Sequence, residues 1–406
     1  MQNCIKNLAI NRNPAIVLGL DVNGLGHVRS LALTGIKVIG IYTDYKEVGR
    51  FSKLCISIKF PNIKEDREKF KKKLITLGKS LSHKAVLFAT NDLYAEFISE
   101  FKEELQSFFL FTIPDKELLD KIINKNTMKE LAERAGLTVP KTFSLLSYES
   151  ITKIAETLTY PCLIKPLDSF SINFPGKNIL INNKQEFIEF YHNNPHFVGK
   201  TIIQELITGG DQNIFQCTTY FNKNSIPLCV FTMQKIRQYP PCFGITSFGV
   251  SKTIPELIEQ TFIFLKNINH KGFASVEFKW DEKRQKYFFF EVNPRLPWYN
   301  SLFTASGVNF PYIAYLDHTS SCILKNKMPK QIDGVYWLNF RVDISSFWRR
   351  RKLGDKISLS QWLQSIFCAR SFAYWHKKDP LPFCWASLDF LSFLGSKFVE
   401  NLTKYL

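Results

Sequence analysis

The 406 residues are 45% apolar, enough to bury a substantial core in two or three domains, which excludes a disordered or fibrous chain. No apolar run approaches the ~20 residues needed to span a bilayer, and Met1 to Ala9 lack the continuous apolar core of a secretion signal. The formal charge of +17 invites a nucleic-acid partner, but the lysines are spread along the chain without a recognisable nucleic-acid-binding motif, so no nucleic acid is expected.

Cysteine usage points to the compartment. The nine cysteines stand singly, with no CxxC pair and an odd total. This pattern favours reduced thiols in a cytosol and disfavours a zinc site. We therefore expect a soluble, cytoplasmic protein with a solvated basic surface and a pocket for an anionic substrate.

The first segment alternates strands and helices. Short apolar runs at 15–20, 37–42 and 84–90 are each predicted as buried strands, and the apolar-periodic stretch after the first run ends at Gly35. Such alternation predicts a parallel sheet with crossover helices. The glycines of Asn23–His27 could hold a phosphate at a helix N-terminus, but a tight turn needs glycine for backbone reasons alone, and we favour that explanation.

A second, α+β unit follows. A helix is predicted from Lys116 to Ala135, with Asp115 as its cap and Gly136 at its end. Further predicted elements are strands at 162–166, 178–181 and 201–205, a helix near 184–192, and a loop from 168 to 177. This mixture of elements distinguishes the unit from the first domain.

The most informative stretch predicts a β-hairpin, with alternating runs at 272–280 and 287–293. Glu277 and Glu291 are anomalous in these aromatic strands, because a buried carboxylate must be paired or bind a metal. Glu291 and Asn293 project to one face, where Glu277 can meet them from the partner strand. Carboxylate and amide oxygens suit Mg²⁺, whereas a surface hairpin with its glutamates in water is the alternative.

Five motifs then occur in a fixed order. They are Lys125 on the helix before Gly136–Pro140, Tyr160–Pro166, Ile203–Asp211, Glu277, and Glu291–Arg295. In this order they resemble the ATP-grasp superfamily, which includes biotin carboxylase, carbamoyl-phosphate synthase and D-alanine:D-alanine ligase. The similarity covers roughly residues 14–320 and is closest to a branch of carboxylate-amine ligases that includes D-aspartate ligase and proteins associated with cell-surface polysaccharide synthesis.

The resemblance implies an α/β and α+β multidomain protein. A parallel-sheet pre-ATP-grasp domain at residues 1–115 would precede a two-lobed ATP-grasp fold at 116–330. The nucleotide-binding lobe would span about 140–207 and the metal-binding lobe about 208–330, leaving 331–406 as a basic, aromatic C-terminal extension.

The resemblance also implies which residues bind the nucleotide and the metal. Lys125 and Lys165 would approach the ATP phosphates as compact positive charges. The other roles are as follows: Gln204 would meet the adenine amino group, Glu205, Leu206 and Ile207 would line the adenine edge, Asp211 would accept from the ribose hydroxyls, and Glu277, Glu291 and Asn293 would hold Mg²⁺, with Mn²⁺ as an alternative. Arg295 would stabilise the acyl phosphate and the tetrahedral intermediate.

Two segments depart from the family pattern. The loop that closes over the phosphates is Gly-rich in many members, whereas 169–177 contains one Gly, and Lys177 would supply by charge what backbone amides supply elsewhere. Residues 233–244 are predicted as a loop in which Lys235 and Arg237 could clamp the carboxylate or the phosphate, with Arg237 bidentate. A basic surface loop is the alternative.

Simpler explanations exist for other residues. Lys125 could be an ordinary exposed helix lysine, like its neighbours Lys121 and Lys129. Asp211 could be a turn residue. In the extension, cations beside Trp348 could seat a helix on an anionic membrane surface. They could equally pack the extension on the body with their charges in solvent, which we favour.

The implied function is an ATP-dependent carboxylate-amine, or thiol, ligase that forms an acyl phosphate. Its partners would be a small-molecule carboxylate and amine, cell-surface or amino-acid-derived compounds among them. One alternative is an ATP-binding regulatory protein of the same fold that has lost catalysis, against which the intact Glu277, Glu291, Asn293 and Arg295 set counts. Another is a basic adaptor indifferent to ATP. The substrates and the oligomeric state cannot be deduced from the sequence.

Overall fold

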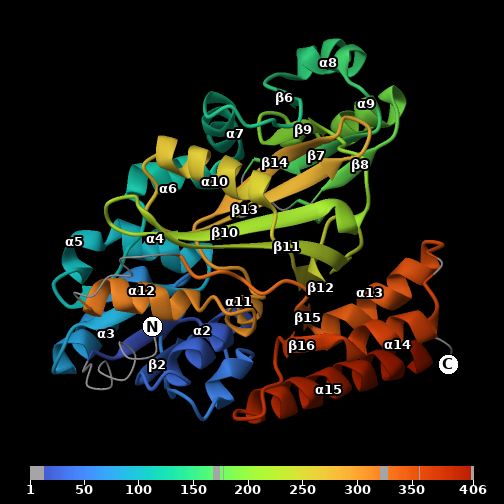
Figure 1. The fold of residues 1–406 in the computed structure, drawn as a ribbon. Helices are drawn as coiled ribbons and strands as arrows, with labels where there is room; N and C mark the ends of the chain where they lie inside the picture. The colour runs from blue at the N-terminus through green and yellow to red at the C-terminus, as the bar shows by residue number, and fades with distance from the viewer. Residues whose placement is uncertain (1–12, 168–173, 177, 321–327, 356, 404–406) are drawn as a thin grey trace.

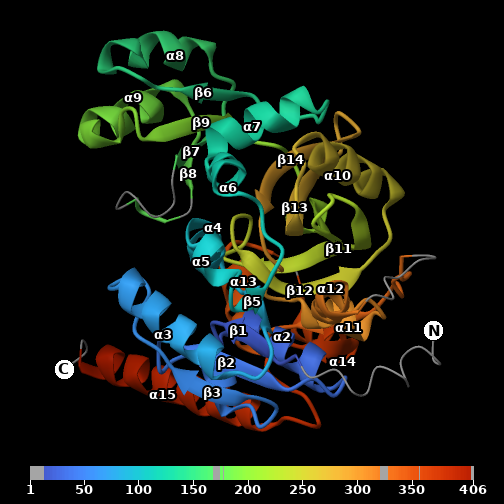
Figure 2. The same ribbon diagram turned by 90° about the vertical axis from the view of Figure 1, so that its left-hand side faces the viewer.

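The computed structural model describes residues 13–167, 174–176, 178–320, 328–355 and 357–403, with side chains as far as residue 392. Three sheets organise the molecule: a five-stranded sheet at the N-terminus, a four-stranded sheet at the opposite end, and a seven-stranded sheet between them (Figures 1 and 2). The predicted combination of α/β and α+β architecture is confirmed.

The N-terminal sheet is parallel in each described pairing, with the order β3-β2-β1-β4-β5. Its elements are β1 (Ala15–Leu18), α2 (Val22–Ala32), β2 (Val38–Tyr42), the 3₁₀ turn η1 (Val48–Phe51), β3 (Ile56–Lys59), α3 (Arg67–Ser80), β4 (Ala85–Ala89), α4 (Asp92–Glu100), α5 (Lys102–Leu105) and β5 (Phe109–Leu110). All four residues of β1 are buried, as expected for a central parallel strand covered on both faces.

The glycines of α2 have a packing role. A Cβ on Gly24 would lie 1.9 Å from the carbonyl oxygen of Gly19, and one on Gly26 would lie 1.9 Å from Oδ1 of Asn300. Both positions therefore exclude any side chain. This close packing supports the explanation that the glycines serve the backbone.

The predicted helix at 116–135 is two helices, which corrects the prediction. α6 (Lys116–Ile123) ends at Asn124, and α7 (Lys125–Arg134) begins after it. The Asn124 backbone is extended, and its side chain accepts from the backbone amides of Asn126 and Thr127, so it caps a new helix. The break makes Lys125 the first residue of α7.

The four-stranded sheet is antiparallel, in the order β6-β9-β7-β8. Its elements are β6 (Thr142–Ser144), α8 (Ile151–Thr157), β7 (Cys162–Pro166), β8 (Ile179–Ile181), α9 (Lys184–Asn193) and β9 (Thr201–Glu205). Side chains of α8 and α9 form a separate hydrophobic core with this sheet. The predicted strands and the helix at 184–192 are confirmed.

The seven-stranded sheet has the order β14-β13-β10-β11-β12-β15-β16. Its elements are β10 (Ile214–Phe221), β11 (Pro227–Tyr239), β12 (Ile245–Ser251), α10 (Pro255–Asn267), β13 (Gly272–Asp281), β14 (Lys286–Asn293), α11 (Ser301–Ala305), α12 (Phe310–Thr319), β15 (Tyr336–Leu338) and β16 (Ala369–Phe372). The predicted hairpin is β13–β14. The predicted loop at 233–244 is wrong, since its first residues belong to β11 and the turn covers only 240–244.

The C-terminal extension is joined to this sheet. It contributes β15 and β16, and adds α13 (Phe340–Lys352), α14 (Leu359–Phe367) and α15 (Leu381–Thr403). Arg29 of α2 pairs with Asp379 at 3.0 Å between Nε and Oδ2, with both side chains buried. The extension therefore packs on the body, as favoured above. Among the described helices, none has the length and apolar character that crossing a bilayer requires.

Candidate active site

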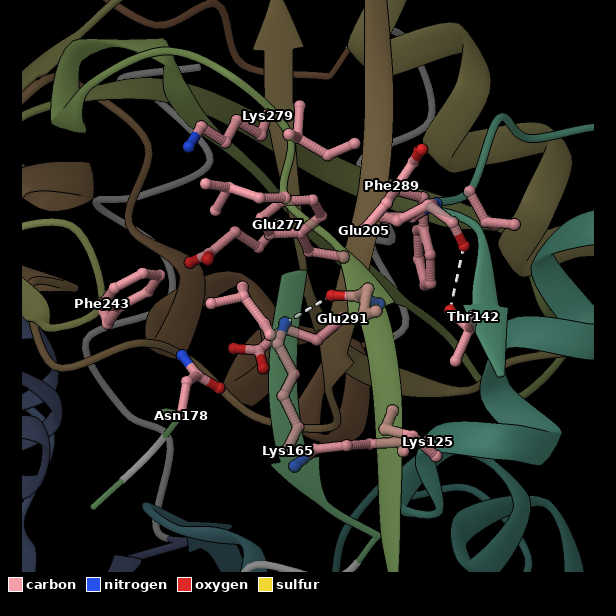
Figure 3. A pocket seen from close by; sticks show the side chains of 18 of the residues that line it. Lys125, Thr142, Lys165, Asn178, Glu205, Phe243, Glu277, Lys279, Phe289 and Glu291 are labelled. Carbon is pink, nitrogen blue, oxygen red and sulfur yellow. Dashed lines mark hydrogen bonds between the residues drawn. The ribbon is translucent and has the colours of Figure 1, made fainter. Parts of the chain in front are cut away.

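A cleft lies between the four-stranded sheet and the β13–β14 side of the large sheet. Lys165 of β7 and the segment from Gln204 to Ile207 line one side, while Glu277 and Glu291 line the other (Figure 3). The two sheets thus bring cationic, amide and carboxylate groups together in one cavity.

The two glutamates are direct neighbours across the hairpin. Glu277 of β13 is paired in register with Glu291 of β14, and Ser275 with Asn293. Asn293 lies two residues beyond Glu291, and its Nδ2 is 3.4 Å from the Glu291 Oε1. The prediction that the hairpin places the two glutamates opposite each other is confirmed.

Glu277 is supported from inside the sheet. Lys235 Nζ and Gln216 Nε2 each lie 2.8 Å from the same oxygen of Glu277, Oε2. Glu277 is only 7% exposed, so this carboxylate would be costly to bury without those donors. Lys235 itself does not line the cleft. It contributes to the cleft indirectly, by holding the Glu277 side chain.

Lys165 and Gln204 are diagonal neighbours on two adjacent strands of the four-stranded sheet. Lys165 Nζ donates to Gln204 Oε1 at 2.5 Å, from the neighbouring strands β7 and β9. Glu205, Leu206 and Ile207 follow along the same wall of the cleft. An ammonium and a run of backbone therefore share one side of the cavity.

Lys125 lies where the cleft meets a smaller pocket. Its Nζ donates to the Pro166 carbonyl at 2.7 Å, and its side chain lines both cavities. Of the two neighbouring helix lysines considered as alternatives to Lys125, Lys121 pairs with Glu117 on the exposed face of α6, whereas Lys129 also lines the cleft. The helix break after Ile123 gives Lys125 its place at the start of α7.

Asn293 lines the smaller pocket, and Arg295 contacts two residues that line it but is not among the lining residues of either cavity. Asn293 lines that pocket together with Asp92 and Glu291. Arg295 Nε lies 3.0 Å from Asp92 Oδ1, and Arg295 Nη2 lies 3.3 Å from Asn293 Oδ1. Arg295 therefore ties the end of β14 to the first helical residue of α4 in the N-terminal unit.

Arg237 lies elsewhere. Its guanidinium makes a two-bonded contact with Asp343 of α13, at 2.9 and 2.8 Å, and donates to Ser365 Oγ at 2.9 Å. The Arg237 and Asp343 side chains are 5% and 0% exposed. Arg237 is not among the residues that line the cleft, because α13 covers it and occupies its donors.

Asp211 is also held away from the cleft. It accepts from the backbone and side chain of Gln238, from the backbone of Cys242, and from Arg350. It is 4% exposed and does not appear among the residues that line the cleft. Asp211 thereby fixes the turn between β11 and β12. Lys177 lies outside the described residues.

Sequence reasoning missed Lys279 and Asn178, which both line the cleft. Lys279 is 7% exposed, and burial lowers the pKa of its ammonium. It follows Glu277 by two residues, so the alternation of β13 places both on one face. That alternation was the signal that could have identified Lys279.

The donor set of the hairpin fits Mg²⁺. Magnesium is usually bound by one or two carboxylates, with water and substrate phosphates completing the octahedron. Glu277, Glu291 and Asn293 supply two carboxylates and one amide within reach of one another. In the described part of the chain, no three His, Cys, Asp or Glu side chains are grouped as a metal cage.

Residues 120–309 match the family model of the carbamoyl-phosphate synthase L chain, ATP binding domain. The matched region is slightly less than half of the chain, and it contains both walls of the cleft, with Lys165 on one side and Glu277 and Glu291 on the other. The chain is also similar to the D-aspartate ligase of Enterococcus faecium, with 28% identity over 313 residues. The matched region covers 72% of this chain and 74% of that relative.

Solved structures show the same fold. Biotin carboxylase from Campylobacter jejuni has a TM-score of 0.62 at 15% identity, covering 81% of this chain and 75% of that one. The N5-carboxyaminoimidazole synthetase of Staphylococcus aureus complexed with ADP has a TM-score of 0.58 at 16% identity, and the match covers 85% of this chain and 99% of that one. The L-amino acid ligase from Bacillus licheniformis has a TM-score of 0.57 at 13% identity, and the match covers 79% of this chain and 75% of that one. At such low identities the likeness concerns the fold alone.

Proposed function

We propose that the protein is an ATP-dependent carboxylate-amine ligase that works through an acyl phosphate. The observation that carries the proposal is the placement of Glu277 and Glu291 opposite each other in a cleft whose other wall holds Lys165. Binding a nucleoside triphosphate requires carboxylates that hold the metal ion and an ammonium that contacts the phosphates.

The nucleotide would lie along the wall from Gln204 to Ile207. There the adenine would meet backbone groups and the apolar side chains of Leu206 and Ile207, with its phosphates directed toward Lys165 and Lys125. The structure gives no support to a ribose contact from Asp211, because that carboxylate is saturated by four donors. Lys279 lies on the same face as Glu277 and is a further candidate for a phosphate contact.

Glu277, Glu291 and Asn293 would hold Mg²⁺. When bound, this ion would offset the negative charge that the phosphates bring into the cleft. Lys235 holds Glu277 in place, because its ammonium is buried against that carboxylate. Lys165 and Lys125 would hold the terminal phosphate in line with the incoming carboxylate.

The reaction would then proceed in two balanced steps. A carboxylate oxygen attacks the γ-phosphorus, the bond to the β,γ-bridging oxygen breaks, and ADP and an acyl phosphate form. The amine then attacks the acyl carbon, loses a proton, and expels phosphate, which carries away one oxygen of the former carboxylate. Arg295, at the end of β14, is the cation proposed to stabilise the oxyanion of the second step.

The proposal is tested by ADP release from Mg²⁺-ATP with a panel of acids and amines, D-aspartate first because of the relative's name. Release that requires both an acid and an amine supports the ligase. Glu291→Gln should abolish it, whereas Glu259→Gln, on the exposed side of α10, should not. Tight ATP binding without release for any pair would favour the regulatory alternative, and no ATP binding would refute both.

A further inference from the structure

The C-terminal helices expose an unusual share of the chain's large apolar side chains. In the described residues, 24 large hydrophobic side chains are exposed, and 12 of them lie between residues 340 and 391. That segment is about one eighth of the chain. Scattered exposed apolar residues are normal in soluble proteins, but a concentration of them marks an interaction surface.

Helix α14 carries an ordered part of this surface. Leu359, Leu363 and Phe367 recur every four residues and are 49%, 41% and 78% exposed. The buried face of the same helix is different: Trp362 stacks on Phe347 and donates to Asp343 at 2.8 Å. The exposed stripe is therefore additional to the face that packs on the protein.

Helix α15 is apolar on both sides. Its inner side packs on η1, where Trp385 stacks on Phe51 with the rings 4.2 Å apart, and Ala386 is buried. On other sides, Leu388 and Leu391 are 58% and 63% exposed. Because one side of the helix is already packed on the protein, these leucines leave apolar surface that the single chain does not cover.

The C-terminal extension is rich in cations, above all at the end of α13. At the end of α13, Arg349, Arg351 and Lys352 are exposed beside Trp348 and Leu353. Residues 331–406 contain 11 Lys and Arg against 6 Asp and Glu. Two of these six acids, Asp343 and Asp379, are buried in ion pairs with Arg237 and Arg29. The exposed part of the extension is accordingly more positive than its composition suggests.

We propose that α13, α14 and α15 form a surface that binds anionic lipid bilayers peripherally. In Figure 1 these helices, coloured orange to red, lie together at one side of the molecule, away from the four-stranded sheet. The Arg341–Asp389 pair links α13 to α15, and Trp362 links α14 to α13, so the three helices present their side chains as one unit.

Charge and side-chain type together select the bilayer as the occupant. Tryptophan, phenylalanine and leucine enter the boundary between headgroups and acyl chains, while arginine and lysine at the edge attract anionic headgroups. A surface of this type would hold the ligase beside a membrane without a spanning segment. The inference stands independently of the ligase activity.

The test is flotation of the full chain with vesicles of phosphatidylglycerol mixed with phosphatidylcholine, and with vesicles of phosphatidylcholine alone. We expect flotation with the mixed vesicles and weaker flotation when salt is raised, because exposed charges are screened. The double variant Leu363→Asp/Phe367→Asp should lower partitioning by about tenfold or more, since it places two charges where apolar side chains enter the bilayer. The variant Arg351→Gln/Lys352→Gln should weaken binding to the mixed vesicles only.

The matched control is Ile226→Asp/Ile263→Asp, which changes two exposed isoleucines outside the extension. This control should float as the wild type does, and circular dichroism should show that all variants are folded. Failure of the wild type to float at low salt would overturn the proposal, as would unchanged flotation of Leu363→Asp/Phe367→Asp. A wild-type dimer in solution that this variant converts to monomer, without vesicle binding, would instead assign the surface to a second copy of the chain.

Discussion

The Lys235 ammonium lies 2.8 Å from the Glu277 carboxylate, and the two side chains are only 5% and 9% exposed. The pair is buried in the large sheet, and Glu277 also lines the cleft. The same interaction therefore affects both the stability of the sheet and the position of a cleft residue. A change in one partner leaves the charge of the other uncompensated.

Lys235→Met should destabilise the protein by about 3–5 kcal/mol, because it leaves the Glu277 carboxylate buried with one donor instead of two. Adding Glu277→Leu should recover part of that loss, since two apolar side chains replace the pair. Denaturant unfolding of both variants measures this. Equal loss in the single and double variants would mean that the pair is not coupled.

The Arg29–Asp379 pair should anchor the C-terminal extension. Asp379→Ala removes the buried partner of Arg29 and should cost about 3–5 kcal/mol. Asp389→Ala breaks the exposed Arg341–Asp389 pair and should cost at most about 1 kcal/mol. Thermal unfolding compares the two. Similar losses would contradict the idea that burial decides the difference.

Two buried histidines should make the protein sensitive to acid. Burial lowers the pKa of both His27 and His270 to about 4, from an ordinary value of 6.5. The unfolded chain therefore binds protons that the native state rejects, so stability falls as pH drops from about 6.5 to 4, by up to about 3 kcal/mol for each histidine. Unfolding measured across this range should show the slope.

His270→Gln provides the control for that slope. The variant removes one of the two titrating groups and should flatten the pH dependence without abolishing it. A slope unchanged in the variant would show that His270 is not one of the groups responsible.

Lys165→Met should weaken ATP binding by about ten- to a hundredfold, the equivalent of one charge-assisted hydrogen bond. Lys153→Met, on the exposed side of α8, should leave the affinity unchanged. Calorimetric titration with ATP distinguishes them. Equal affinities would remove Lys165 from the nucleotide site.

Much of the architecture could be predicted from local patterns. The buried strands of the first sheet are short apolar runs, and the β13–β14 hairpin is an alternating pair around a polar turn. The break at Asn124 was missed because the apolar pattern continues across it, while a side-chain cap starts the second helix. Local signals thus identified elements better than their ends.

The cleft was predicted in part. Glu277 and Glu291 could be identified because charged residues in apolar strands require a partner or a ligand, whereas Lys165 was implied only by the resemblance to the ATP-grasp superfamily. The positions of Arg237 and Lys235 could not be predicted, because their ion-pair partners, Asp343 and Glu277, are far away in the sequence. Long-range ion pairs of this kind leave no signal in a local window.

The most direct measurement is calorimetric titration of the protein with ATP in the presence and absence of Mg²⁺, for the wild type and Glu291→Gln. We predict that Mg²⁺ strongly tightens ATP binding to the wild type and that Glu291→Gln loses most of this dependence. Glu259→Gln should behave as the wild type. Equal dependence on Mg²⁺ in Glu291→Gln and the wild type, or no ATP binding to the wild type, would contradict a nucleotide site built on the two glutamates of the hairpin.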